Sequence, residues 1–356
     1  MEGVLFLSQN IFRKDIEYRK KYSYSYNGKD VYPVIMKESL MKIIDVHSHF
    51  ILDSYLEGLN KQNVDPFLED GFPTPKWSPE AHLQYMEEAN IERCILSLST
   101  PHVHHGDDKA AAELAREINE ETAAICAKYP DKFSFAECLP LPAIEASLEE
   151  IAYAYDKLGA VGVKVASNNH GVYLGDPSLD PVFEELNRRH AVITIHPSKP
   201  QEVPGNVFTA GPTPLFEYLG DTTRAVLNMM VKGTLEKYPN IKVIVPHSGS
   251  FLPLVIHRLI GISEVLIPKG VMEPVNVGEN FKKLYFDIAG DALPVALDAL
   301  MKVADPTHIM YGGDFPYTPV PMIVKKQKDL FQHPRIQPYL EDMMYHNASK
   351  LFHIME

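Results

Sequence analysis

The chain has 356 residues, enough for one large domain or two of medium size, and its 45% hydrophobic content is enough to bury a sizeable core. Its formal net charge of -13 argues against nucleic acid or an anionic membrane as a partner, because both bind basic surfaces. Three scattered cysteines, Cys94, Cys126 and Cys138, show neither zinc-finger spacing nor a disulfide framework, which favours a reducing, cytoplasmic location. No apolar run approaches the roughly 18 residues of a membrane span.

Residues 1–40 differ from the rest of the chain. They are rich in Tyr, Lys and Arg and lack clear periodicity, and Met41 stands directly before the first strong strand pattern. Two interpretations stay open: an upstream extension from a wrongly assigned start, or a genuine N-terminal arm that packs on the main domain or on a partner subunit. N-terminal sequencing of the native protein separates them. Residues 41–356 are predicted to form a single domain.

From Met41 onward, eight apolar runs rich in β-branched residues predict strands that are buried on both faces. They cover residues 42–48, 93–99, 133–140, 160–167, 191–198, 242–249, 284–290 and 308–315. Helical patterns separate most of them, at 110–128, 143–158, 181–189, 222–238 and 293–303. This alternation predicts an α/β fold of the (β/α)8 TIM barrel type. The alternative, an open doubly wound sheet, lacks its Gly-rich phosphate loop after the first strand.

Two connections, residues 50–90 and 199–221, are longer than usual and contain several prolines. Both follow predicted strands, so they belong to the face of the barrel at which the strands end. Active sites are built on this face.

Polar side chains stand at the ends of four predicted strands. His47 and His49 end the first strand, and residues i and i+2 of a strand point the same way. His196 ends the fifth strand, His247 the sixth and Asp314 the eighth. Each histidine alone is more often a satisfied core or surface residue than a ligand. Together, three imidazoles and a carboxylate predict a zinc-type site with a position left for water or substrate.

Other histidines are interpreted as loop residues. His102, His104 and His105 follow the second strand, and a solvated loop is favoured over a place at the mouth of the barrel. His170, in Asn168-Asn169-His170-Gly171, is expected in a turn that tolerates unusual backbone angles.

The strand-end motifs resemble those of the amidohydrolase superfamily, metal-dependent hydrolases in type, and in particular its decarboxylase branch, which includes aminocarboxymuconate semialdehyde decarboxylase. The resemblance covers residues 41–352. It rests on the motifs Asp45-Val46-His47-Ser48-His49, Ile195-His196-Pro197, Pro246-His247-Ser248-Gly249 and Gly312-Gly313-Asp314-Phe315-Pro316. Residues 74–78, 216–218 and 221–224 look most like members of the 6-methylsalicylate decarboxylase type.

The resemblance implies that one divalent metal, zinc most often and manganese in some members, is held by His47, His49, His196 and Asp314. It implies that His247 is catalytic. Relatives supply an arginine to the substrate carboxylate across a dimer interface, which implies a homodimer and a substrate-binding role for Arg258.

Lys164 on the fourth strand leaves a second interpretation open. Hydrolytic members with two metals carry a carboxylated lysine on that strand, so an inward Lys164 would allow a two-metal hydrolase. An outward or salt-bridged lysine is the favoured interpretation.

The predicted function is metal-dependent, non-oxidative decarboxylation of a small aromatic or unsaturated carboxylic acid. Asp314 or His247 would give the proton to the carbon that loses CO2. Hydrolysis of a lactone, amide or ester on the same site is the alternative. A non-catalytic barrel is disfavoured because every ligand position is filled.

Substrate contacts are predicted from the same motifs. Trp77, Phe50 and Phe315 are candidates for an apolar wall around the ring. Residues 50–92 contain no arginine, so Lys76 is the nearby candidate cation for the acid group, with Lys61 as the other cation of that segment.

Overall fold

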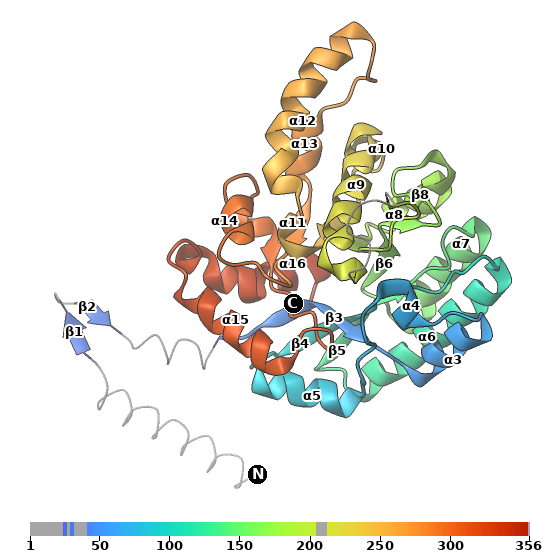
Figure 1. Ribbon diagram of the computed structural model, residues 1–356. Helices are drawn as coiled ribbons and strands as arrows, with labels where there is room; N and C mark the ends of the chain where they lie inside the picture. Colours follow the sequence, from blue (N-terminus) through green and yellow to red (C-terminus); the bar gives the residue numbers. More distant parts are fainter. Residues whose placement is uncertain (1–23, 27–28, 32–40, 204–211, 355–356) are drawn as a thin grey trace. The chain divides into compact units, whose positions relative to one another are not determined.

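The computed structural model describes residues 24–26, 29–31, 41–203 and 212–354 (Figure 1). The chain divides into two compact units, residues 1–42 and 43–356. In the first unit, β1 (Tyr24–Tyr26) pairs antiparallel with β2 (Lys29–Val31). Most of residues 1–40, and with them the choice between extension and arm, lie outside the described residues. Residues 204–211 of the second long connection also lie outside them.

The second unit is built on eight parallel strands in the order β12-β11-β10-β9-β6-β5-β4-β3. Their bounds are β3 (Ile44–Phe50), β4 (Arg93–Leu98), β5 (Phe133–Cys138), β6 (Gly162–Ala166), β9 (Val192–His196), β10 (Lys242–Val245), β11 (Tyr285–Asp287) and β12 (Ile309–Met310). Seven of them lie inside the predicted runs, and β3 extends two residues past the predicted end at Ser48, to Phe50. A short hairpin of β7 (Asn168–Asn169) and β8 (Val172–Tyr173) follows β6.

The sheet closes on itself between β3 and the segment after β12. Ser48 forms a parallel bridge with Phe315, and the His49 amide donates to the Phe315 carbonyl at 2.7 Å. The Val46 amide donates to the Tyr311 carbonyl at 3.1 Å. These bonds confirm the predicted barrel and exclude the open sheet.

Helices surround the strands (Figure 1). The α-helices are α3 (Asp53–Lys61), α4 (Pro66–Asp70), α5 (Pro79–Glu88), α6 (Asp108–Lys128), α7 (Ile144–Tyr153), α8 (Asp180–Arg188), α9 (Glu217–Val231), α10 (Thr234–Lys237), α11 (Pro246–Gly249), α12 (Leu252–Leu266), α13 (Val277–Lys282), α14 (Ala296–Leu300), α15 (Val320–Gln332) and α16 (Asn347–Phe352). Short 3-10 turns are η2 (Pro177–Leu179), η3 (Thr213–Leu215), η4 (Ile267–Lys269), η5 (Pro306–His308) and η6 (Gln337–Tyr339), and π-helical turns are η1 (Ala154–Leu158) and η7 (Asp342–His346). No helix of the described residues is long and apolar enough to span a membrane.

The connection between β3 and β4 is more ordered than its prolines indicated, because it contains α3, α4 and α5. Pro66 and Pro79 stand at the starts of helices, where a missing N–H is tolerated. Ser78 caps α5 by accepting a hydrogen bond from the Ala81 amide at 3.1 Å. Prolines that looked like loop residues therefore mark helix starts.

A hydrophobic core cluster packs the strands against the C-terminal segment. Its buried residues come from six of the strands and from the C-terminal segment: Ile44, Val46, Ile95, Ala136, Val192, Ile244, Met310, Ala348, Phe352 and Ile354.

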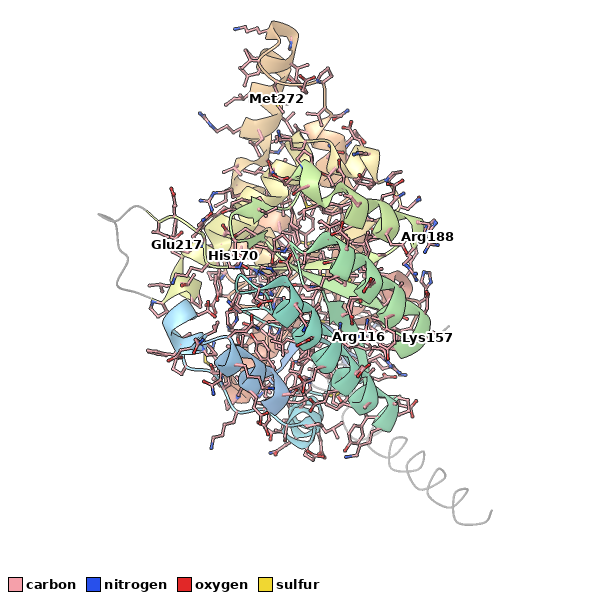
Figure 2. All side chains as sticks on the ribbon, turned by 90° about the vertical axis from the view of Figure 1, so that its right-hand side faces the viewer. Arg116, Lys157, His170, Arg188, Glu217 and Met272 are labelled. Atoms are coloured by element: carbon pink, nitrogen blue, oxygen red, sulfur yellow. The ribbon has the colours of Figure 1, made fainter. Side chains whose placement is uncertain are left out.

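Helices α12 and α13 project from one side of the barrel, and Met272, between them, lies out on this projection (Figures 1 and 2). The sequence reading did not include α12. Its apolar residues are spread around the helix, which hides the helical period.

Candidate metal centre

Three histidines meet inside the barrel where β3 and β9 end. His47 and His49 come from β3 and His196 from the last position of β9, and all three are buried. Their candidate ligand nitrogens all lie within 4.8 Å of one another. The pattern of two histidines one residue apart therefore does place both rings on the interior face.

The second nitrogen of each ring is held by an acceptor. His47 Nδ1 lies 2.8 Å from Asp287 Oδ2, His49 Nδ1 donates to the Ser97 carbonyl at 3.2 Å, and His196 Nδ1 donates to the Pro197 carbonyl at 2.9 Å. A carbonyl only accepts, so His49 and His196 carry their proton on Nδ1 and turn the Nε2 lone pair to the centre. The buried Nε2 atoms of His47 and His49 have no hydrogen-bond partner among the described residues. Such orphaned acceptors fit a metal ion.

Asp314 supplies the carboxylate of the centre. Its Oδ1 lies 3.3 Å from His49 Nε2 and 3.6 Å from His47 Nε2. Thr318 Oγ1 donates to Oδ2 at 3.3 Å, which fixes the carboxylate plane. Asp314 has a φ of +61°, an uncommon value for a residue other than glycine, and its amide donates to the His47 carbonyl at 2.7 Å. The backbone is thus turned so that the four predicted ligands face one space.

Two glycines before Asp314 are required by close packing. A Cβ on Gly312 would lie 2.8 Å from the Cβ of His47, and a Cβ on Gly313 would lie 2.8 Å from Asp45 Oδ2 and overlap the Tyr85 hydroxyl. The Asp45 carboxylate in turn accepts hydrogen bonds from the amides of His47 and Gly313, at 2.9 and 3.0 Å. This buried carboxylate therefore ties the β3 ligands to the loop that carries Asp314.

Burial keeps the imidazoles of His49 and His196 neutral. It lowers the pKa of His49 to about 4 and the pKa of His196 well below its usual range. Burial alone would raise the pKa of Asp314, but the close approach of His49 and the other neighbouring histidines holds it below its ordinary value. Neutral imidazoles and an ionised carboxylate are the protonation states that bind a divalent cation.

His247 stands beside the centre without joining the three-histidine cluster. Its ring centre lies 5.1 Å from that of His47, and its buried Nδ1 has no hydrogen-bond partner among the described residues. It follows β10 with a φ of +56°, and its amide donates to Asp287 Oδ1 at 3.0 Å. Burial lowers the pKa of His247 to about 4. The position suits a residue that exchanges a proton with a molecule bound at the centre.

Asp287 was missed by the sequence reading. It ends β11, is fully buried, and receives hydrogen bonds from His47, His247 and Ala289. Burial acts to raise its pKa, but His47 holds the pKa below its ordinary value. The signal that could have found it is a carboxylate at the end of the seventh strand, the same signal that revealed Asp314 in the eighth.

Two tyrosines and one further histidine also border the centre. The ring centre of Tyr317 lies 5.7 Å from that of His49, and the ring centre of Tyr218 lies 6.2 Å from that of His196. The Tyr218 hydroxyl is 2.7 Å from Thr100 Oγ1. The ring centre of His102 lies 5.7 Å from that of His196.

The preferred interpretation of His102 as a solvated loop residue is wrong. Its Nε2 is buried, and burial lowers the pKa of its imidazole to about 3. The reason is the adjoining Val103, which is buried and whose carbonyl accepts a hydrogen bond from Gln62 at 3.2 Å, so the loop is pinned to the barrel mouth. The interpretation of His104 as solvated is also wrong, because its side chain is only 7% exposed and pairs with Asp108 at 2.8 Å. His170 behaves as predicted and sits in a turn with a φ of +49°.

Lys164 faces the inside of the barrel, so the favoured outward or salt-bridged orientation is wrong. In the pairing of β6 with β9, Lys164 lies beside Thr194 and Ala166 lies beside His196. Thr194 and His196 are two residues apart, so they point to the same face of the sheet, and Lys164 points to that face as well. The side chain is 3% exposed, and Nζ has no hydrogen-bond partner among the described residues. Burial lowers the pKa of Lys164 to about 8, against the opposing influence of Asp287 and Asp314.

The aromatic residues predicted to form a substrate wall pack elsewhere. Trp77 Nε1 donates to His82 Nδ1 at 3.0 Å, and the His82 ring meets that of Phe315 edge-on at 5.0 Å. Phe315 also stacks on Tyr85 at 4.4 Å. Phe50 is fully buried, one residue beyond His49 and therefore on the opposite strand face. These contacts describe packing residues, and a substrate role for Trp77 or Phe315 stays a prediction.

Neither predicted substrate cation lies buried at the centre. Lys76 is exposed in the connection before α5, and Arg258 is exposed on α12. A contact of Arg258 with substrate requires a partner subunit and stays a prediction.

Comparison with known proteins places this geometry in a family. The sequence model of the amidohydrolase family matches residues 44–354. The chain is 36% identical over 289 residues to the 6-methylsalicylic acid decarboxylase of Aspergillus aculeatus, covering 79% of this chain and 86% of that protein. It is 35% identical over 300 residues to the decarboxylase macB of Penicillium terrestre, covering 80% and 87%.

Solved structures show the same barrel. A crystal structure of an amidohydrolase II is 36% identical and covers 87% of this chain and 99% of that one, with a TM-score of 0.82. The 5-carboxyvanillate decarboxylase of Novosphingobium aromaticivorans, solved with bound manganese, is 24% identical and covers 89% and 98%, with a TM-score of 0.80.

Proposed function

This chain belongs to the amidohydrolase family and is a carboxy-lyase of that family's decarboxylase branch, and we propose that its substrate is a 2-hydroxybenzoate of the 6-methylsalicylate type. The reaction is metal-dependent, non-oxidative decarboxylation of an aromatic acid. The observation that carries the proposal is the buried cluster of His47, His49 and His196 with the partly buried Asp314 beside it, together with relatives above 30% identity that are named for 6-methylsalicylic acid.

The four ligand side chains would hold one divalent ion. When bound, it supplies a Lewis acid that orients the acid group and the neighbouring ring hydroxyl of the substrate. Zinc is the expected ion, and manganese is supported by its presence in the 5-carboxyvanillate decarboxylase structure. Three imidazoles and one carboxylate suit either ion. Elemental analysis of protein purified without added metal tests this: about one ion per chain is expected, and its loss in His196→Ala.

The chemical step is a proton transfer followed by C–C cleavage. Asp314 or His247 takes up a proton from water and passes it to the ring carbon that bears the carboxylate. The electron pair of the C–C bond then returns to the ring, and the carboxylate leaves as CO2. Asp314 and His247 both lie close to His47, so one can donate the proton that the other restores. His247→Asn is expected to keep the metal and to lower kcat by about 100-fold or more.

The surroundings of the centre keep bulk water away from this step. The rings of Tyr317 and Tyr218 meet those of His49 and His196 edge-on, and the His102 ring lies 5.7 Å from that of His196. An apolar, aromatic border strengthens the electrostatic interactions inside it and provides a surface for an aromatic ring.

A hydrolase on the same site is the second candidate, and the inward Lys164 is the observation that favours it. Two readouts separate the candidates. One CO2 per substrate and one metal per chain support decarboxylation, whereas ring or ester opening without CO2 and two metals per chain support hydrolysis. The uncarboxylated ammonium of Lys164 opposes a second cation by charge repulsion.

A homodimer formed through α12 is the proposed assembly. Leu254, Arg258, Ile262 and Val265 recur at intervals of four, four and three along α12, so they share one helix face. The three apolar side chains of this stripe are 69%, 41% and 52% exposed. An exposed apolar stripe on a projecting helix fits a self-complementary interface, and an arginine within it could reach a partner's site.

Light scattering tests the dimer. Ile262→Glu is expected to shift the protein to monomers, while Met322→Glu, an equally apolar and exposed position on α15, should leave dimers intact. A monomeric wild-type protein would overturn this proposal and the role of Arg258.

A cytoplasmic location is proposed from the cysteines. Cys94, Cys126 and Cys138 are all free thiols, and two of them are buried. Free thiols persist in reducing compartments. Fractionation of the source cells tests the location, and recovery outside the cytoplasm would contradict it.

A further inference from the structure

Lys164 is a buried charge with no hydrogen-bond partner among the described residues. Its side chain is almost fully excluded from solvent, and the ammonium carries three N–H donors. Burying such a group unpaired costs several kcal/mol. Within the described parts of the chain, Lys164 is also the only lysine or arginine that is buried. A barrel that keeps this charge inside indicates that an anion joins it there.

The charge lies on the His196 side of the metal centre. The strand register aligns Lys164 with Thr194, one interior layer below His196. After burial, the charge of Lys164 is the strongest influence that lowers the pKa of both His196 and His102. Asp287 and Asp314 are the carboxylates that act on Lys164 in turn. The ammonium is therefore close to the centre rather than deep in the apolar core.

His102 adds a second unpartnered polar atom on the same side. Its ring centre lies 5.7 Å from that of His196, and its buried Nε2 has no partner in the described parts of the chain. Its φ of +64° is unusual for a bulky residue, so the backbone holds it in place at some cost. Lys164 Nζ and His102 Nε2 are thus two buried polar atoms that lack a partner among the described residues on the His196 side of the centre.

We propose that Lys164, with His102 beside it, forms the subsite that binds the carboxylate of the aromatic acid, on the His196 side of the metal centre. This inference rests on the proposed function and deepens it. The carboxylate would pair with the ammonium of Lys164 beside the residues that would hold the metal, and its negative charge would offset the repulsion between the two cations. Lys164 acts as a positioning residue, because holding the acid group fixes the attached ring carbon opposite Asp314 and His247.

The subsite also accounts for product release. Cleavage converts the carboxylate into uncharged CO2, so the ammonium loses its partner when the C–C bond breaks. The remaining phenol then binds without this contact. Loss of Lys164 is therefore expected to raise KM more than it lowers kcat.

Calorimetry on metal-loaded, full-length protein tests the subsite with two probes: benzoate, which has the carboxylate alone, and phenol, which has the hydroxyl alone. Lys164→Met, similar in length but uncharged, is expected to bind benzoate about 10- to 100-fold more weakly and phenol within about twofold of wild type. His102→Asn, which tolerates positive φ, is expected to weaken benzoate binding by about threefold or more. Lys109→Met, at a side chain 85% exposed on α6, is the matched control.

Metal content and melting temperature are measured on every variant. Unchanged benzoate affinity in folded, metal-loaded Lys164→Met overturns the inference, as does a wild-type protein that binds no benzoate. If Lys164→Met does not fold, the benzoate affinity of His102→Asn is used instead, and an unchanged affinity overturns the inference.

Measuring CO2 release on the same samples distinguishes failure of the subsite proposal from failure of the decarboxylase proposal. CO2 release with benzoate binding that does not depend on Lys164 overturns the subsite and leaves the decarboxylase standing. Lys164-dependent benzoate binding without CO2 release from any hydroxybenzoate supports the subsite and overturns the decarboxylase.

Discussion

His47 and Asp287 are joined by a hydrogen bond of 2.8 Å between Nδ1 and Oδ2, and both side chains are fully buried. The other oxygen of Asp287 accepts the amide of His247. One carboxylate thus orients a metal ligand and the neighbouring catalytic candidate at once. Acceptors of this kind fix the tautomer of a ligating imidazole and raise its basicity.

Asp287→Asn is therefore expected to weaken metal binding about 10- to 100-fold, because the amide keeps the shape but removes the charge behind His47. Competition with a metal-sensitive dye measures the dissociation constant. Asp291→Asn, at a side chain 88% exposed and paired with Lys326, is the control and should bind metal as wild type does. Equal affinities in both variants would show that Asp287 does not tune the centre.

Tyr85→Phe tests the link between Asp45 and the loop of Asp314. The Tyr85 hydroxyl donates to Asp45 Oδ2 at 2.7 Å, and burial already raises the pKa of Asp45 to about 6. Removing a donor from a buried carboxylate is expected to lower the free energy of unfolding by about 1–3 kcal/mol. Urea denaturation measures it. Tyr153→Phe, whose hydroxyl bonds Glu120 at the surface, should lose less than about 0.5 kcal/mol; a similar loss in both variants would contradict the argument.

Gly312→Ala tests the close approach of the loop to His47. The added methyl group would stand 2.8 Å from the His47 Cβ, between two backbone-bonded segments that cannot easily separate. We expect the variant to lose most of its bound metal, measured by elemental analysis, while Gly220→Ala, which has open space around its Cβ on α9, retains it. Full metal content in Gly312→Ala would show that the centre tolerates displacement.

Glu137 predicts a pH dependence of stability. It is buried on β5, neither carboxyl oxygen has a hydrogen-bond partner in the described parts of the chain, and burial raises its pKa well above the ordinary value. The folded state therefore holds this proton more tightly than the unfolded state, so its contribution is full below about pH 4.5 and falls as pH rises.

Glu137→Gln should remove the part of the loss of stability with rising pH that Glu137 causes. The free energy of unfolding, measured by urea denaturation at pH 5 and pH 8, is expected to fall less in Glu137→Gln than in wild type. The exposed Glu149→Gln on α7 should follow wild type. Parallel pH profiles for all three proteins would mean that Glu137 does not titrate differently on folding.

The sequence predicted site residues best where polar residues interrupt apolar strands. His47, His49, His196 and Asp314 stand out because a buried strand has little use for them otherwise, and the barrel brings their strand ends together. The eight strands were found for the same reason, since near-continuous apolar runs are distinctive.

The features that escaped are those decided by packing in three dimensions. The direction of Lys164 was hidden because its neighbours Val163 and Val165 give no alternation of polarity. His102 looked solvated because the burial of Val103 depends on contacts with a distant helix. Trp77 and Phe315 were predicted to contact substrate because they are aromatic residues near the motifs, and in the structure both contact His82.

The most direct measurement of the central claim is the CO2 released per molecule of hydroxybenzoate consumed, with 6-methylsalicylate first in the series, by metal-loaded protein and by His196→Ala. We predict one CO2 and one phenol per acid from the wild-type protein and none from the variant. Consumption of substrate without CO2, or no turnover of any hydroxybenzoate by protein that carries its metal, would contradict the assignment.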